Sequence, residues 1–125
     1  MGVQGYHLAR AAEARKAAET LRADQPGWAL VPLFYSAMHV MHARFDADEL
    51  PSDERHPIVH KSHREAGRVA WWGTADVVRA RYPHVSPQYT SLSSASYATR
   101  YGEPPRGDGQ RLWDEYEQLT AAVAG

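Results

Sequence analysis

The segment from about Trp28 to Asp46 constrains the fold most strongly, because its large apolar residues recur at alternating spacings of three and four. This spacing places them on one face of an α-helix. Pro32 falls in the first turn of the predicted helix, where a missing N–H costs nothing. The apolar seam consists of Val31, Phe34, Met38, Met41 and Phe45. A parallel stripe beside the seam carries Tyr35, His39, His42 and Asp46.

Other segments also have helical character, and glycine and proline residues separate them. Residues 4–23 are rich in Ala, Glu, Arg and Lys, which favour helices, and they place small residues on one face. Further helices are predicted over about 57–72, 75–82, 87–101 and 110–124. No sustained alternation typical of strands competes. The sequence therefore predicts an all-α protein with a single domain over 1–125. We expect an up-and-down bundle of four to five helices, with a core over 4–102 and an extra C-terminal helix over about 110–124.

The composition limits the partners and the compartment. The chain has 125 residues, no cysteine and a formal net charge of -1. Without cysteine, disulfides and thiolate metal sites are impossible. The balanced charge argues against a broad electrostatic nucleic-acid binder but leaves room for a small cationic pocket. No apolar run is long enough to span a bilayer, and the first residues do not resemble a signal peptide. We therefore expect a cytoplasmic protein with no membrane partner and no cofactor.

An arginine followed five positions later by a histidine is the main candidate for chemistry. Arg55 and His60 flank the predicted start of the helix over 57–72. A guanidinium suits a phosphate, and an imidazole transfers protons near neutral pH. Together they could cleave RNA without a metal, by general acid–base catalysis and charge stabilisation. His63 and Arg64 lie close to His60 on the predicted helix and could help to hold an anion.

Two further groups of residues have both a functional and a structural interpretation. Arg79 and His84 repeat the Arg-to-His spacing, so the spacing alone is a weak signal. The alternative for either pair is polar side chains at a solvated loop edge. Tyr89, Tyr97 and Tyr101, with Arg100, could stack on nucleobases, or they could form aromatic core and rim.

Histidines on the stripe of the second predicted helix allow a metal-site interpretation. His39 and His42 are three residues apart, and histidines with this spacing can ligate a metal in a helical bundle. His60 and His63 from the next predicted helix, or His7 from the first, would complete the ligand set. The competing interpretation is that His39 is buried, with its ring nitrogens hydrogen-bonded to neighbours, and that His42 lies at the boundary of the core. His7, on the packing face of the first helix, then belongs to the core as well.

Three parts of the chain resemble proteins of the HEPN-domain family. The first is the run from Trp28 to Ala43, with its aromatic, small, apolar and histidine residues. The second is Tyr89, Leu92 and Ser96 with the ending Ala98-Thr99-Arg100-Tyr101. The third is a proline loop at Pro51 that leads to His60, His63 and Arg64. The resemblance covers roughly residues 4–102 and consists of helix order and a few residue types.

The resemblance implies a helical bundle that is usually dimeric. Many family members are metal-independent ribonucleases, often toxins paired with a nucleotidyltransferase-like antitoxin, whereas others are inactive and bind nucleotides, RNA or protein. Active members use an Arg, then a polar residue, then a His, and Arg55, His56 and His60 match this pattern. We therefore expect an endoribonuclease that uses Arg55 and His60, assisted by His63 and Arg64. The alternatives are a non-catalytic module that binds a partner protein or nucleotide, and a His-rich metal-binding bundle.

Overall fold

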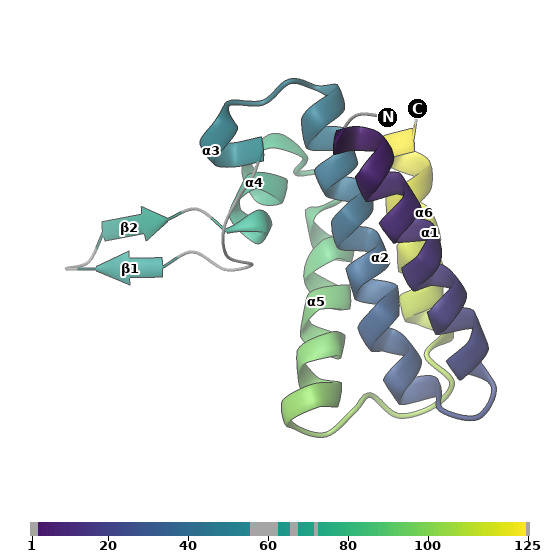
Figure 1. The fold of residues 1–125 in the computed structure, drawn as a ribbon. Coiled ribbons are helices and arrows are strands. Elements are labelled where there is room, and N and C mark those ends of the chain that lie inside the picture. The colour runs from purple at the N-terminus through teal and green to yellow at the C-terminus, as the bar shows by residue number, and fades with distance from the viewer. Residues whose placement is uncertain (1–2, 56–62, 66–67, 72, 125) are drawn as a thin grey trace.

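Four long helices form the body of the protein, and they run alternately down and up (Figure 1). The computed structural model describes residues 3–55, 63–65, 68–71 and 73–124. The long helices are α1 (Val3–Arg22), α2 (Pro26–Ala47), α5 (Ser86–Tyr101) and α6 (Gln110–Ala124). Between α2 and α5 the chain forms α3 (Ser52–Arg55), β1 (His63–Glu65), β2 (Arg68–Trp71) and α4 (Thr74–Arg81). The predicted up-and-down helical bundle is therefore confirmed.

The predicted helix over 57–72 is wrong where the structure describes the chain. Strands β1 and β2 pair in antiparallel orientation, with Arg64 opposite Val69 and Glu65 opposite Arg68. The second strand contains a β-branched residue and ends in an aromatic one, and both residue types favour strands over helices. Residues 56–62, which include the predicted start of the helix, lie outside the described residues.

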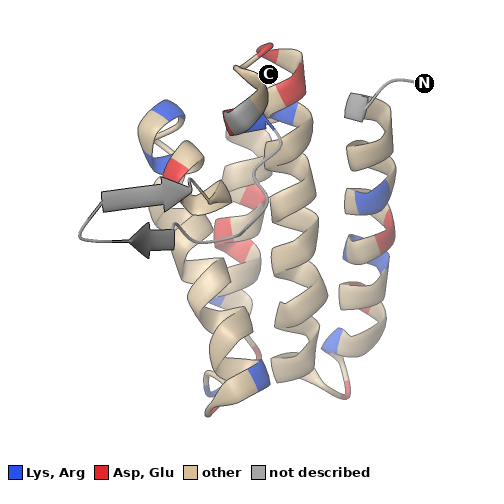
Figure 2. Ribbon diagram, turned by 60° about the vertical axis from the view of Figure 1, so that its left-hand side comes forward, with Lys and Arg blue, Asp and Glu red and all other residues tan. Residues whose placement is uncertain are grey.

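Helix α2 lies at the centre of the bundle and packs against α1, α5 and α6. Its only charged residues are Arg44 and Asp46, so most of its length can be covered by other helices. Figure 2 shows this contrast with α1, which carries charges of both signs along its length. The fully buried apolar side chains of α2 include Leu30, Leu33, Ala37, Met41 and Phe45.

No described helix is both long and apolar enough to cross a membrane.

The start of α2 differs from the sequence prediction. The helix begins at Pro26, so Pro32 lies in its second turn rather than its first. Pro32 has no N–H to offer to the carbonyl of Trp28, which is a cost that the first turn would have avoided. Tertiary packing outweighs this local cost, because the apolar face of α2 is buried on both sides of the proline.

A buried hydrogen-bonded group connects three of the long helices. The Ser36 hydroxyl on α2 donates to the Ala11 carbonyl on α1 at 2.7 Å. Because that hydroxyl has one hydrogen, it accepts from the Tyr116 hydroxyl on α6, which lies 2.8 Å away. One face of α6 is buried, so this helix, expected as an addition to a core over 4–102, belongs to the core of the bundle. This face consists of Leu112, Trp113, Tyr116, Leu119 and Val123.

Candidate functional site

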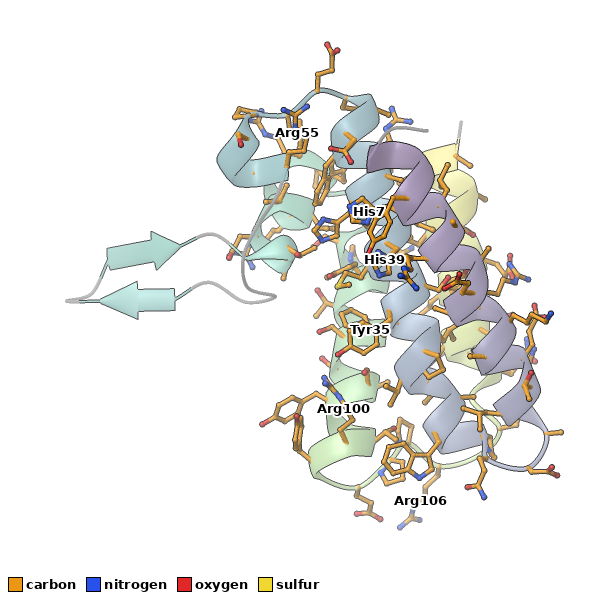
Figure 3. All side chains as sticks on the ribbon, viewed as in Figure 1. His7, Tyr35, His39, Arg55, Arg100 and Arg106 are labelled. Atoms are coloured by element: carbon orange, nitrogen blue, oxygen red, sulfur yellow. The ribbon has the colours of Figure 1, made fainter. Side chains whose placement is uncertain are left out.

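Four side chains follow one face of α2, and each of them meets a residue from a different element. Tyr35, His39, His42 and Asp46 lie at spacings of four, three and four, which aligns them along the helix. We refer to this line as the α2 stripe, and it is about 16 Å long at 1.5 Å per residue. The residues that meet it are, in the same order, Arg100 of α5, His7 of α1, Thr74 of α4 and Arg55 of α3. Figure 3 shows His7, His39, Tyr35 and Arg100 following one another along this side of the bundle.

His7 and His39 form a hydrogen bond that joins α1 to α2. Their Nδ1 atoms are 2.9 Å apart, and their ring centroids are 5.2 Å apart. One ring must donate and the other accept, so both rings cannot be doubly protonated while the bond exists. In the neutral pair, the donor ring keeps a lone pair on Nε2 and the acceptor ring carries a hydrogen on Nε2. The pair therefore contains one base and one weak acid.

The surroundings of His39 favour its neutral form. Burial lowers the pKa of His39 below its ordinary value, and repulsion by His7 and Arg10 lowers the pKa further. The Tyr6 ring packs edge-on against both imidazoles, with centroid distances of 5.2 Å to His7 and 6.4 Å to His39. His39 is therefore held as a neutral imidazole near pH 7, the state in which it can accept a proton.

The lowered pKa of His39 predicts that acid weakens the fold. In the unfolded chain a histidine takes up its proton near about pH 6.5, whereas His39 in the folded chain does so at lower pH. The stability that His39 contributes is thus fully present above its unfolded pKa and is lost as the pH falls through its folded pKa. In urea unfolding between about pH 7.5 and 5.5, we expect the free energy of unfolding to fall less for His39→Asn than for the wild type. Equal losses in the two proteins would show that His39 does not titrate as proposed.

His42 completes a cluster of three imidazoles, although the sequence placed it at the boundary of the core. Its ring is buried and stacks on His7, with centroids 5.1 Å apart and planes inclined by 29°. Its Nε2 lies 3.2 Å from the Thr74 hydroxyl. Gly73 is the N-cap of α4, and it donates its N–H to Asp76 at 3.0 Å. The Thr74 hydroxyl is therefore available to His42. We refer to His7, His39 and His42 as the histidine cluster.

The contacts of the histidine cluster are those of hydrogen-bonded rings. Within the described part of the chain, no group of three or more His, Asp or Glu residues could hold a metal ion. His39 turns Nδ1 towards His7, and His42 turns Nε2 towards Thr74. His60 and the side chain of His63 lie outside the described residues. The four-histidine metal set therefore stays a prediction.

Arg100 is the single charged residue of α5. Its Nη1 donates to the Tyr35 hydroxyl at 3.2 Å, and its Nε donates to the Ser96 carbonyl at 3.4 Å. The guanidinium carbon lies 5.1 Å from the ring centroid of Tyr101 and 5.8 Å from that of Tyr35. No carboxylate of the described residues forms an ion pair with Arg100. Its charge faces aromatic rings and neutral oxygens, and it can still bind an anion.

Arg55 meets the opposite end of the α2 stripe. Its Nε lies 3.8 Å from Asp46 Oδ1, with 34% of the Arg55 side chain and 10% of the Asp46 side chain exposed. This distance is too long for a hydrogen bond, and neither Arg55 Nε nor Asp46 Oδ2 has a hydrogen-bond partner among the described residues. The guanidinium is thus close to a carboxylate but only loosely held by it.

The remaining sequence candidates cannot be placed relative to Arg55. His60 and its neighbour His56 lie outside the described residues. The backbone of His63 and Arg64 forms β1, and their side chains also lie outside the described part.

The second Arg-to-His pair lies at the surface. Arg79 forms an ion pair with Asp76 at 2.6 Å, and 69% of its side chain is exposed. His84 is exposed as well.

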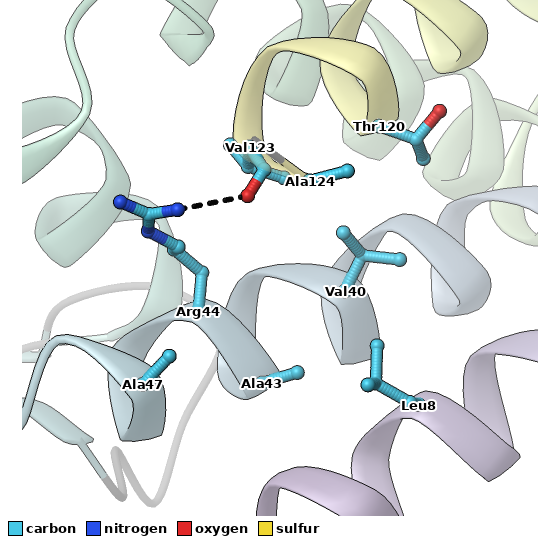
Figure 4. Close-up of a pocket in the computed structure, with 8 residues that line it drawn as sticks. All are labelled: Leu8, Val40, Ala43, Arg44, Ala47, Thr120, Val123 and Ala124. Carbon is cyan, nitrogen blue, oxygen red and sulfur yellow. Dashed lines mark hydrogen bonds between the residues drawn. The ribbon is translucent and has the colours of Figure 1, made fainter.

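An apolar groove of about 300 Å³ lies between α1, α2 and α6 (Figure 4). Arg44 is its single ionisable lining residue, and it donates to the Val123 carbonyl at 3.0 Å and pairs with Asp48 at 2.9 Å. The groove could therefore hold an apolar group, but it has no side chain that could act as a general acid or base. Its other lining residues are Leu8, Val40, Ala43, Ala47, Thr120, Val123 and Ala124.

The sequence grouped His7 with His39 only as possible metal ligands, and their hydrogen bond was not predicted, although a signal for it existed. In two antiparallel helices joined by a short turn, residues at similar distances from the turn lie at the same height. His7 lies 15 residues before the end of α1, and His39 lies 13 residues after the start of α2. The contact of Arg100 with Tyr35 had no comparable signal, because it depends on how α5 packs on α2.

Comparison with known proteins adds no relative to this picture. No protein-family model, no curated protein and no solved structure is significantly similar to the chain. The site must therefore be interpreted from its own geometry.

Proposed function

We propose that this protein is a HEPN-like, metal-independent endoribonuclease of the cytoplasm, which binds single-stranded RNA along the α2 stripe. The observation that supports the proposal most strongly is the hydrogen bond between His7 and His39. It joins two imidazoles that share one hydrogen between their Nδ1 atoms. One helical turn away, Arg100 contacts Tyr35 and has no carboxylate partner among the described residues. Two imidazoles and a guanidinium are sufficient for RNA cleavage without a metal.

The proposed reaction is transfer of the phosphate from the 5′-oxygen to the neighbouring 2′-oxygen. One imidazole accepts the proton of the 2′-hydroxyl, and the oxygen attacks phosphorus. The bond from phosphorus to the 5′-oxygen breaks. The ring that took this proton on Nε2 passes its Nδ1 hydrogen across the shared hydrogen bond, and the other ring gives its Nε2 hydrogen to the leaving oxygen. The guanidinium stabilises the charge that develops on the phosphate oxygens. The products are a 2′,3′-cyclic phosphate and a free 5′-hydroxyl.

The residues expected from the sequence offer a second assignment of the same roles. Arg55 would bind and polarise the phosphate, and His60 would act as general acid or base. His63 and Arg64 would assist. Arg55 meets the α2 stripe at Asp46, so this second site would lie next to the stripe.

The test of the proposal is cleavage of a labelled single-stranded RNA in the presence of a chelator. We expect cleavage to persist with EDTA and mass spectrometry to identify a 2′,3′-cyclic phosphate, because none of the proposed steps needs a metal. Under the second assignment, the double variant Arg55→Ala/His60→Ala is expected to lose activity. Its matched control is Arg79→Ala/His84→Ala, which removes residues with the same spacing from the surface.

Two results would contradict this proposal. Absence of cleavage of any single-stranded RNA by the wild type would remove the enzymatic function. Full activity of Arg55→Ala/His60→Ala would remove the assignment made from the sequence and leave the α2 stripe as the site.

A non-catalytic binding module is the second candidate, and the ion pair of Arg55 with Asp46 favours it. That pair partly neutralises the charge that an active site would need for phosphate. In this version the protein is a homodimer that binds a nucleotide or a partner protein, such as a nucleotidyltransferase-like antitoxin. Stable co-purification with a protein encoded by the adjacent reading frame, without cleavage of RNA, would favour this candidate over the enzyme.

A further inference from the structure

Aromatic side chains are exposed at the end of the bundle where α2 begins and α5 ends. Trp28 is 52% exposed, Tyr97 is 55% exposed and Tyr101 is 69% exposed. These are three of the five large hydrophobic residues that the described part of the chain exposes. The Thr99 hydroxyl donates to the Gly27 carbonyl at 3.3 Å, so the last turns of α5 lie against the start of α2. Large aromatic surfaces gathered at one place are typical of binding sites.

A cation lies among these rings. Tyr97 and Tyr101 contact each other with centroids 5.0 Å apart, and the guanidinium of Arg100 lies 5.1 Å from the Tyr101 centroid. Arg106 lies at the same end of the bundle (Figure 3). Glu103 and Asp108 in the same loop offset its charge. Binding here must therefore come from stacking on the rings and from one arginine, rather than from a strong positive field.

The aromatic group is continuous with the α2 stripe. Arg100 contacts both Tyr101 and Tyr35, and Tyr35 is the first residue of the stripe. Trp28 lies two helical turns before Tyr35, on the same face of α2. A strand of RNA whose bases stack at this end would have its backbone directed along α2 towards the histidine cluster.

We infer that Trp28 at the start of α2, together with Tyr97 and Tyr101 beside Arg100, forms a stacking platform for the unpaired bases of single-stranded RNA. The choice of RNA as the ligand rests on the proposed function. Aromatic rings and arginine planes stack on bases of any sequence, because every base has a π-face. Bases within a duplex are covered by their neighbours, so the platform accepts single strands and excludes double-stranded RNA.

The test uses a fluorescein-labelled 2′-O-methyl oligoribonucleotide of about twelve nucleotides, a length within the range of known single-strand sites. This probe lacks the 2′-hydroxyl, so binding is measured by fluorescence anisotropy without cleavage. We expect Tyr97→Ala/Tyr101→Ala to bind it at least about 5-fold more weakly than the wild type. Tyr97→Phe/Tyr101→Phe keeps both rings and is expected to bind like the wild type.

The dependence on salt separates stacking from general charge attraction. A site with one arginine releases about one counterion, so log Kd is expected to change with log salt with a slope of about 0.7. Arg100→Gln should remove most of this slope. Arg111→Gln removes a charge from the exposed side of α6 and should leave both the slope and the affinity unchanged.

Several outcomes would overturn the inference. One is that Tyr97→Ala/Tyr101→Ala binds the oligonucleotide as tightly as the wild type does. A second is that the wild type binds single-stranded and double-stranded RNA equally well. A third is that the wild type binds a proline-rich peptide and does not bind RNA. Binding without any cleavage of natural RNA would refute the proposed enzyme but support the platform. Cleavage with no loss of affinity in the alanine variant would refute the platform and leave the enzyme.

Discussion

Replacing His39 with Asn is expected to slow RNA cleavage by about 100- to 10,000-fold, the usual contribution of a general acid or base. Asn places an amide nitrogen or oxygen close to the position of Nδ1, so it can keep a hydrogen bond to His7. It has no proton to exchange near neutral pH. The variant therefore removes the chemistry and retains much of the contact between α1 and α2. The measurement is the single-turnover rate of cleavage of a labelled RNA at saturating protein.

The control for this variant is His84→Asn, which changes an exposed histidine of the same chain. Its cleavage rate should equal that of the wild type. Circular dichroism and a thermal melt near neutral pH establish that both variants are folded. A cleavage rate within about 3-fold of the wild type for folded His39→Asn would exclude His39 from proton transfer.

Replacing Phe45 with Ala is expected to lower the free energy of unfolding by about 3–5 kcal/mol, as large-to-small changes of aromatic core residues do. Phe45 is fully buried near the C-terminal end of α2. Its ring lies against Tyr82, with centroids 5.7 Å apart, and against His42, with centroids 5.3 Å apart. Removing the ring leaves a cavity between the bundle and the segment that contains α4. Urea unfolding followed by circular dichroism measures the change.

Leu8→Ala provides the comparison, because 49% of Leu8 is exposed. This variant should change the free energy of unfolding by no more than about 0.5 kcal/mol. A loss below about 1 kcal/mol for Phe45→Ala would mean that Phe45 does not fill a close-packed core.

The long helices could be predicted from the sequence because burial along a helix repeats at its own period. The alternating spacing of Phe34, Met41 and Phe45 marks the face of α2 that the other helices cover. The hairpin of β1 and β2 could not be predicted in this way. Its strands have only three and four residues, too few for a period of two to stand out from chance.

The candidate site could be predicted only in part. The sequence placed Tyr35, His39, His42 and Asp46 on one stripe, and this alignment follows from helix geometry alone. It did not supply the residues that meet the stripe, because those come from four different elements whose packing is a property of the folded chain. The sequence shows that Arg100 is the single charged residue of α5. Its place at the site becomes clear only from its contact with Tyr35 in the folded chain.

Helix α2 carries both core residues and the residues of the α2 stripe, so a rotation about its axis moves both sets together. Each residue added to a helix turns everything beyond it by about 100°. One residue inserted directly after Phe34 would therefore rotate His39 and His42 away from α1. The same rotation would move Met41 and Phe45 out of the core. A change of one residue within α2 would consequently disturb the core and the histidine cluster at once.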